Sequence, residues 1–185
     1  MEIIKGKEFL LKNTCVTIGK FDGLHLGHQM LLAEMQKYQN SYTTVMLNFD
    51  FSQWENTLKK GSESRKLYTE EQKISCLEKK GPAVLIEYPF DRVTADTSAY
   101  DFIKDILIGQ LDAKVIVVGE NFRFGRAAQG DTAFLKEYER EFGYKTIIMD
   151  CVKINDRVVS STRIRDEISH GNLSQAEALL NKNYW

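Results

Sequence analysis

Cysteine, histidine and proline are scarce in this chain, and each shortage argues against a class of protein. The 185 residues contain three cysteines, three histidines and two prolines. Cys15, Cys76 and Cys151 form no C-x-x-C pair, so the sequence indicates neither a disulfide framework nor a cysteine-based zinc site. An odd number of scattered cysteines predicts reduced thiols in a cytoplasmic protein.

Long apolar runs and an excess of one charge are also missing. The formal net charge is −1, so no general basic field exists to hold nucleic acid, and any phosphate must be bound by local clusters. No segment has the length of a signal peptide or membrane span. We therefore expect neither nucleic acid nor a membrane as a partner, while the sequence leaves the oligomeric state open. The length and the 43% hydrophobic content predict one globular domain over residues 1–185.

Segments rich in β-branched residues alternate with segments of helical periodicity along the whole chain. We expect strands at 15–18, 42–49, 83–86, 114–118 and 145–149, and helices after residue 25, from Thr69 to Gly81, and at 98–108, 131–142, 163–170 and 173–180. Residues 51–66 are predicted to form a long polar loop. This alternation indicates an α/β domain with a mostly parallel sheet of five or slightly more strands, covered by helices on both faces. Ligands of such sheets bind at the carboxyl ends of the strands, but the G-x-G-x-x-G fingerprint of nicotinamide enzymes is absent.

The first candidate site follows the first of these strands. Residues 17–29 read T-I-G-K-F-D-G-L-H-L-G-H-Q, so a glycine-containing turn joins a strand to a helix, and His25 and His28 flank Gly27. Such a turn directs backbone N–H groups at an anion, and a histidine in the first helical turn can donate a hydrogen bond to phosphate. The alternatives are a zinc site and a purely structural pair, and the lack of further ligands makes metal the weaker of the two functional readings.

Two further candidate sites occur later in the chain. Residues 118–131 read V-G-E-N-F-R-F-G-R-A-A-Q-G-D directly after a predicted strand, and arginines suit phosphate oxygens while phenylalanines suit a planar ring system. Residues 159–165 read V-S-S-T-R-I-R, where hydroxyl side chains cap a helix and two arginines oppose its dipole unless an anion is nearby. His170 is interpreted as a residue of the last helical turn and not as a ligand.

The three motifs together resemble one family. G-K-F-D-G-L-H-L-G-H-Q is similar to the H-x-G-H signature of the nucleotidyltransferase superfamily, and G-E-N-F-R-F-G-R-A-A-Q-G-D and S-S-T-R-I-R are similar to motifs of the FMN adenylyltransferase module of bacterial bifunctional riboflavin kinase/FAD synthetases. The resemblance covers nearly the whole chain in the order and spacing of that family. It implies a single Rossmann-like nucleotidyltransferase domain that transfers AMP from ATP to FMN, giving FAD and pyrophosphate, with Mg²⁺ accompanying ATP.

The resemblance also implies roles for individual residues. His28, His25 and Arg163 are expected to be catalytic, and no residue is expected to be a dedicated metal ligand. The predicted ATP-binding residues are Gly19, Phe21, Asp22, Gly23, His25, His28, Ser161, Thr162 and Arg163. The predicted FMN-binding residues are Asn48, Asn121, Phe122, Arg123, Phe124 and Arg126.

The chain departs from the family pattern in two places. Residues 50–54 read D-F-S-Q-W where the family has a Pro-His-Pro-like element, and no riboflavin kinase domain is expected within residues 1–185. Two alternatives stay open at this stage. The first is a nucleotidyltransferase that uses another phosphorylated acceptor, and the second is a flavin- or nucleotide-binding regulator without turnover.

Overall fold

The computed structural model describes residues 1–52 and 66–180, and its centre is one sheet of six strands. Every neighbouring pair is parallel, and the spatial order is β1-β4-β3-β2-β5-β6. The strands are β1 (Glu2–Lys5), β2 (Thr14–Gly19), β3 (Thr43–Asp50), β4 (Val84–Pro89), β5 (Ala113–Gly119) and β6 (Lys145–Met149). The predicted α/β class with a mostly parallel sheet is therefore confirmed.

The chain reverses its direction of growth across the sheet at β2. It first adds β3 and β4 on one side of β2 and then crosses over to add β5 and β6 on the other side. In parallel sheets this reversal leaves a crevice at the carboxyl ends of the two central strands. The loops after Gly19 and Gly119 begin at that crevice. They carry the first motif (residues 17–29) and the second motif (residues 118–131), and the third motif is residues 159–165.

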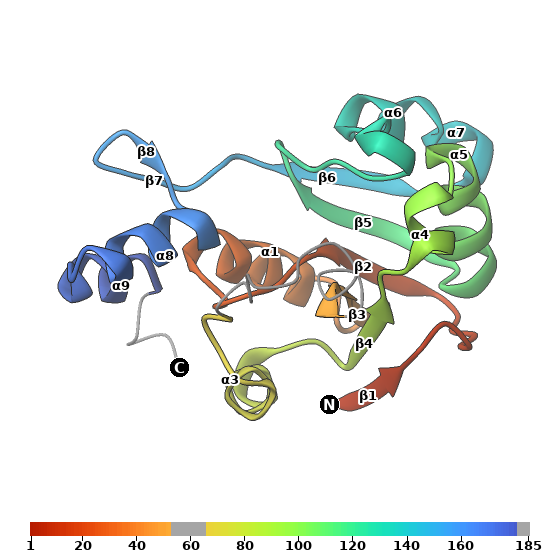
Figure 1. The fold of residues 1–185 in the computed structure, drawn as a ribbon. Coiled ribbons are helices and arrows are strands. Elements are labelled where there is room, and N and C mark those ends of the chain that lie inside the picture. The colour runs from red at the N-terminus through yellow and green to blue at the C-terminus, as the bar shows by residue number, and fades with distance from the viewer. Residues whose placement is uncertain (53–65, 181–185) are drawn as a thin grey trace.

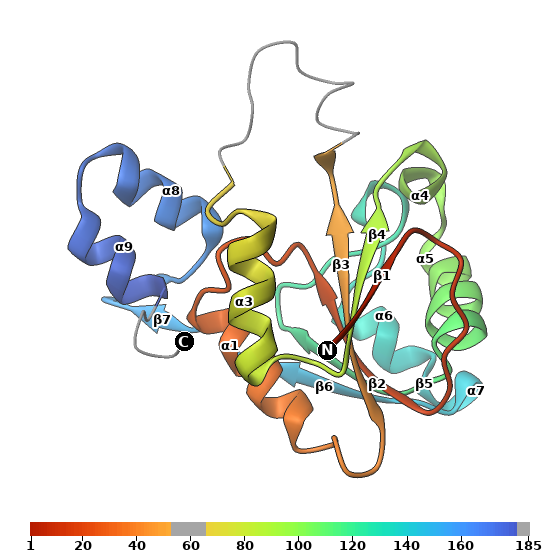
Figure 2. The same cartoon turned by 90° about the horizontal axis from the view of Figure 1, so that it is seen from below.

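Helices cover both faces of the sheet (Figures 1 and 2). One face is covered by α1 (Leu26–Gln36) and α3 (Glu70–Lys80), and the opposite face by the elements between β4 and β6. The latter are α4 (Arg92–Asp96), α5 (Ala99–Asp101), the π-helix η1 (Phe102–Gln110), the 3₁₀ turn η2 (Arg126–Ala128), α6 (Thr132–Glu137) and α7 (Glu139–Phe142). No helix among the described residues is long and apolar enough to span a bilayer.

Strand periodicity divides the core into two clusters. Alternate side chains point to opposite faces, so Met46 and Leu85 pack with α1 and α3, whereas Leu47 and Ile86 pack with η1 and α6. The strands are buried on both faces, as their almost continuously apolar sequences predict. This frame fixes the positions of the loops at the carboxyl edge.

A smaller helical unit lies beside α1, next to the H-x-G-H turn. It consists of the hairpin β7 (Lys153–Ile154) and β8 (Arg157–Val158) followed by α8 (Ser161–Ser169) and α9 (Leu173–Leu180). Its own apolar cluster is made by residues such as Val159, Ile164 and Leu179. The side-chain amide of Gln29 in α1 donates to the Leu180 carbonyl oxygen at 2.8 Å, so the end of α9 is held against α1.

Several elements differ from the sequence prediction. The edge strand β1, the hairpin β7–β8 and the short α4 were not predicted, and the helix expected at 98–108 is a turn of α-helix followed by nine residues of π-helix. The helix expected at 131–142 is interrupted at Tyr138, whose φ of −92° and ψ of 1° are not helical. Most of the loop predicted at 51–66, residues 53–65, lies outside the described residues.

Candidate active site

The H-x-G-H turn begins α1 with an unusual cap. His25 is the N-cap residue, and its Nδ1 accepts a hydrogen bond from the His28 backbone N–H at 3.4 Å. An imidazole nitrogen that accepts must be unprotonated, so the neutral His25 ring carries its proton on Nε2. The His25 and His28 rings stack with centroids 3.7 Å apart and planes 18° apart. The cap therefore fixes both the tautomer of His25 and the mutual placement of the two rings.

Both histidines are held in the neutral form. Burial lowers the pKa of His25 to about 4, and burial together with the neighbouring His25 lowers the pKa of His28 well below its usual value. Within the described part of the chain, the buried Nδ1 of His28 makes no hydrogen bond. The His28 ring also lies 5.0 Å from the Phe21 ring. At neutral pH the pair supplies hydrogen-bond donors without adding positive charge.

Gly27 leaves room for the histidine pair. A Cβ at this position would lie 3.2 Å from Cε1 and 3.3 Å from Nδ1 of His25. The sequence suggested that this glycine clears the way for a ligand, and the structure adds a nearer reason, since a side chain there would press on the capping imidazole. The glycine therefore permits the stacked arrangement of the two rings.

Asp22 connects the turn to two distant segments. One carboxylate oxygen accepts from the Leu67 backbone N–H at 2.9 Å, and the other forms an ion pair with Arg165 at 2.7 Å. The Asp22 carbonyl oxygen accepts from the Ser161 hydroxyl at 2.7 Å. The first motif and the third motif, about 140 residues apart in the sequence, are thus joined at one residue, as predicted if they form a common site.

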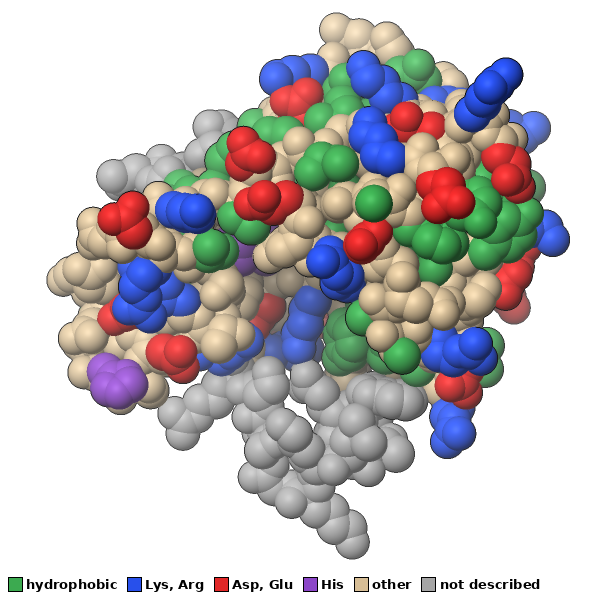
Figure 3. Space-filling model, turned by 90° about the horizontal axis from the view of Figure 1, so that it is seen from above, with side chains coloured by type: hydrophobic (Ala, Val, Ile, Leu, Met, Phe, Trp, Pro, Cys, Tyr) green, Lys and Arg blue, Asp and Glu red, His purple; other side chains and the backbone are tan. Residues whose placement is uncertain are grey.

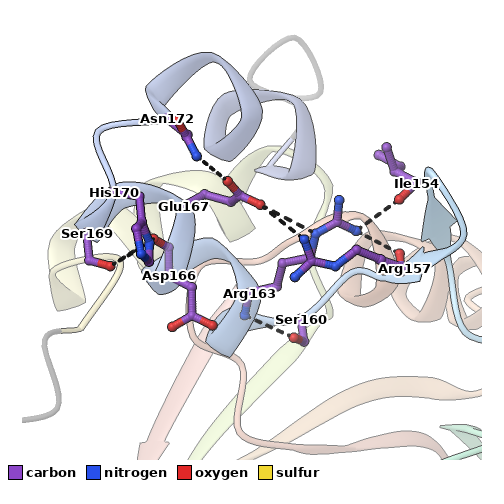
Figure 4. A network of polar contacts seen from close by, with 9 residues as sticks. All are labelled: Ile154, Arg157, Ser160, Arg163, Asp166, Glu167, Ser169, His170 and Asn172. Carbon is purple, nitrogen blue, oxygen red and sulfur yellow. Dashed lines mark hydrogen bonds and ion pairs between the residues drawn. The ribbon is translucent and has the colours of Figure 1, made fainter.

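The two arginines of the third motif have different environments. The Arg163 guanidinium is buried and donates to the carbonyl oxygens of Ile154 at 3.1 Å and Arg157 at 2.7 Å, with Glu167 3.9 Å away (Figure 4). These contacts hold the guanidinium against the β7–β8 hairpin, and the catalytic role of Arg163 stays a prediction. Arg165, which pairs with Asp22, is the arginine that reaches the turn, and it also occupies the last position of the S-S-T-x-I-R pattern.

The third motif begins α8 in the way that its hydroxyl residues predict. Ser160 is the N-cap, and its hydroxyl accepts from the Arg163 backbone N–H at 3.2 Å. Thr162 is exposed in the first turn, whereas Arg165 lies beyond that turn and not within it as predicted. Glu167 and Asp22 neutralise the two arginines, so the repulsion from the helix dipole is offset by the chain's own carboxylates.

The loop after β5 divides into a buried part and an exposed part. Phe124 is buried, and its ring centroid lies 5.6 Å from that of Phe102. A Cβ on Gly130 would lie 2.7 Å from the Phe124 ring. Phe124 is therefore part of the core, and its role as an FMN contact stays a prediction. Phe122 stacks on Phe124 at 5.4 Å and is only half-buried. The other predicted residues of this loop, Asn121, Arg123 and Arg126, are exposed.

A cavity of about 420 Å³ opens at the carboxyl ends of β2, β3 and β4. Its wall combines aromatic rings, carboxylates and lysines, and it includes Phe21, Asp22 and Asn48 from the predicted site. Lys20, Lys66, Lys73 and Glu87 also line it and were not predicted. None of the described residues of the β5 loop contributes to this wall. Figure 3 shows a hollow in the middle of the surface with lysine or arginine side chains inside it.

The structure thus brings together part of the predicted site. Gly19, Phe21, Asp22, Gly23, His25, His28 and Ser161 lie in or against one turn, and the Phe21 N–H donates to Asn48 at 2.9 Å. That N–H and the one of Asp22, which donates to the Lys20 carbonyl, are already satisfied, so the predicted array of unpaired donors is smaller than expected. The signal for Arg165 was available in the motif itself. No sequence signal marked the lysines, because isolated lysines are common on surfaces.

Within the described part of the chain, the arrangement includes no metal centre of its own. Among residues 1–52 and 66–180, no group of three histidine, cysteine, aspartate or glutamate side chains is placed to hold a metal ion. Cys15, Cys76 and Cys151 are all free thiols. The arrangement instead combines neutral donors, lysines and one arginine at the edge of a parallel sheet, and these groups suit the binding of phosphates.

Comparison with known proteins points in the same direction. Bifunctional riboflavin kinase/FMN adenylyltransferases from Buchnera aphidicola and Haemophilus influenzae are 34% and 33% identical to this chain, over 98% and 100% of its length. The chain spans about three fifths of the length of these two relatives, 60% and 61%. An FAD synthetase from Listeria monocytogenes is 33% identical over 89% of this chain and 67% of the relative.

Solved structures show the same similarity at the level of the fold. The crystal structure of a Streptococcus pneumoniae protein named macrolide-efflux protein superposes with a TM-score of 0.82 and 26% identity, over 98% of this chain and 60% of that one. A pantoate-beta-alanine ligase from Francisella tularensis shares only the fold, with a TM-score of 0.54 and 12% identity over 91% of this chain and 77% of that one. The family model described as FAD synthetase matches residues 8–163. This chain therefore belongs to the FAD synthetase family.

Proposed function

We propose that this chain is an FMN adenylyltransferase, which transfers AMP from ATP to FMN and releases pyrophosphate. The observation that carries the proposal is the junction at Asp22, where Ser161 and Arg165 of the third motif meet the H-x-G-H turn beside the cavity. The family match and the names of the relatives support the same reaction. The three free thiols support a cytoplasmic location for the enzyme.

The proposed chemistry needs no general base. A phosphate monoester has a second pKa of about 6, so the FMN phosphate is largely a dianion at neutral pH and can attack the α-phosphorus of ATP directly. One bond forms between an FMN phosphate oxygen and that phosphorus, and the bond to the departing pyrophosphate breaks. The enzyme's task is then alignment and stabilisation of charge on the transferring group.

The described residues can divide that task between two regions. The ATP phosphates would lie between the H-x-G-H turn and the start of α8, near His28, Thr162 and Arg165. FMN would enter the cavity from the side of β3 and β4, where Phe49 and Phe51 provide apolar surface and Lys20 lies 5.1 Å over the Phe51 ring. Neutral imidazoles suit the nucleotide side, since a hydrogen bond donated there stabilises developing negative charge.

Mg²⁺ would enter with the substrate. Both carboxylate oxygens of Asp22 are engaged, one by Leu67 and the other by Arg165, so the turn offers no open carboxylate. Mg²⁺ would then be held by ATP phosphates and water, which is its usual form in nucleotide sites. The ion would neutralise phosphate charge, and the protein would position the nucleotide that carries it.

The test is to incubate the purified chain with ATP, Mg²⁺ and FMN and to follow FAD and pyrophosphate by chromatography. Riboflavin is the matched control because it has the same ring system but lacks the phosphate nucleophile. We expect equal amounts of FAD and pyrophosphate with FMN and no adenylated product with riboflavin. Saturable binding of FMN or ATP without any FAD would instead identify a binding protein. Adenylation of nicotinamide mononucleotide or phosphopantetheine in preference to FMN would identify another acceptor.

A further inference from the structure

A row of three residues in register crosses the carboxyl edge of the sheet beside the H-x-G-H turn. Gly19 of β2 lies opposite Asn48 of β3, which lies opposite Glu87 of β4. Residues directly opposite one another in neighbouring strands point to the same face. Asn48 and Glu87 are therefore on the face covered by α3, and Lys73 of that helix reaches Glu87 at 2.5 Å.

The amide of Asn48 lies between an obligatory donor and an obligatory acceptor. Its oxygen accepts from the Phe21 backbone N–H at 2.9 Å, and its nitrogen donates to a Glu87 carboxylate oxygen at 2.5 Å. A carboxylate can only accept, and a backbone N–H can only donate. The amide consequently has one satisfied orientation, which the Phe21 N–H and the Glu87 carboxylate specify together. Asn48 is buried, and the Glu87 side chain is 13% exposed, so water cannot easily replace either partner.

The Phe21 backbone leads directly to His28. The Phe21 ring is buried, lies against Gly19 and packs 5.0 Å from the His28 ring. An error in the direction of the Asn48 amide would release the Phe21 N–H and the ring next to it. The packing of the Phe21 ring against the His28 imidazole would then be weaker, and His28 would be less well positioned for the proposed reaction.

We propose that Glu87 is a positioning residue, which fixes the Asn48 amide and through it the Phe21 segment against which His28 rests. Lys73 acts as the counter-ion that holds the carboxylate in place. This inference rests on the proposed function only for its effect on rate. The hydrogen bonds from Glu87 through Asn48 to Phe21 exist in the free protein, so they can be tested without substrate.

Substitution of Glu87 or Lys73 by methionine distinguishes this role from that of an ordinary ion pair. In Glu87→Met the acceptor is lost, and the Lys73 ammonium attracts the Asn48 oxygen away from Phe21. In Lys73→Met the carboxylate stays and continues to accept from Asn48. In the double variant the competing ammonium is gone, so the Asn48 oxygen can return to the Phe21 N–H. An ordinary ion pair would make the two single variants alike.

The first measurement is amide hydrogen exchange at Phe21 by NMR, without substrate. We expect exchange to be faster by about tenfold or more in Glu87→Met, little changed in Lys73→Met and largely restored in the double variant. A matched control is Glu34→Met, which removes the carboxylate of the Lys37–Glu34 pair on α1. That pair is also 2.5 Å long, and its carboxylate is 15% exposed. It should leave exchange at Phe21 unchanged.

The second measurement is the rate of FAD formation. Glu87→Met should lower kcat by about tenfold, because the positioning role is exerted through His28. Equal Phe21 exchange in wild type and Glu87→Met would overturn the inference, as would a loss confined to the KM for FMN, which would make Glu87 a direct FMN contact. A wild-type protein that makes no FAD would refute the proposed function and leave the exchange test in force.

Discussion

Acid sensitivity should be built into the H-x-G-H turn, because His25 is buried in its neutral form. Its pKa is lowered from 6.5 to about 4, and the side chain belongs to a residue that is only 8% exposed, so solvent screens the effect little. Between these two pH values the unfolded chain binds a proton that the folded protein does not bind. The free energy of unfolding should therefore fall as the pH is lowered through this window.

The size of the effect follows from the shift. The full difference of about 2.5 pH units corresponds to about 3 kcal/mol, which is reached only below pH 4. At pH 5, where the folded protein still excludes the proton, the loss from His25 alone should be about 2 kcal/mol relative to pH 7.5. This is a large part of the stability of an average domain.

The assay compares wild type with His25→Asn in urea denaturation at pH 7.5 and pH 5. Asparagine is a good N-cap residue and does not titrate, so it retains the cap and removes the proton. The pKa of His28 is lowered as well, mainly by burial, and this main cause remains in the variant. We expect the wild type to lose about 2 kcal/mol more than the variant over this range. Equal losses in the two proteins would refute the reasoning, because His25 would then titrate alike in both states.

Three further predictions concern single side chains. His28→Ala should lower kcat for FAD formation by about 10²–10³ with little change in the KM for ATP, and a change in KM alone would make His28 a binding residue. Arg165→Met should destabilise the protein in urea by about 1–3 kcal/mol and raise the KM for ATP, because it leaves Asp22 without its ion pair. Arg165→Lys should recover part of the stability and part of the ATP affinity. Full activity of Arg165→Met would contradict the proposed junction. Tyr144→Phe removes a hydrogen bond of 2.6 Å to the Leu135 carbonyl on the far face of the sheet, so stability should fall by about 1 kcal/mol at constant kcat.

The sequence predicted those elements whose signals are local. The capping box of Thr69 and Gln72 is formed with both of its hydrogen bonds, and the strand predicted at 145–149 has those bounds. β1 escaped prediction because its four residues are mostly exposed and are ordered by pairing with β4, some 80 residues away in the chain. The two-residue strands β7 and β8 give no periodicity to detect.

The motifs of the candidate site were predictable from the sequence, but the contacts that each side chain makes were not. Arg163 and Arg165 are two residues apart on one helix, and only their tertiary partners decide that one faces the hairpin and the other faces Asp22. The relay from Glu87 to Phe21 depends on strand register, which joins residues that no local pattern connects. Composition and spacing predict which groups are available, whereas packing determines what they contact.

The N-cap of α1 is the clearest case in which the local rules of helix formation are set aside. Elsewhere among the described helices, the side chains that cap N-termini belong to the preferred types serine, threonine and aspartate, namely Thr69, Asp91, Ser98, Asp131 and Ser160. Only His25 departs from them, with a long hydrogen bond and a cost in acid stability. An aspartate would cap more strongly, but it would place a negative charge where the proposed ATP phosphates must lie. A neutral imidazole satisfies the helix, repels no phosphate and keeps its Nε2 proton available as a donor, so the weaker cap fits a turn that serves phosphate chemistry.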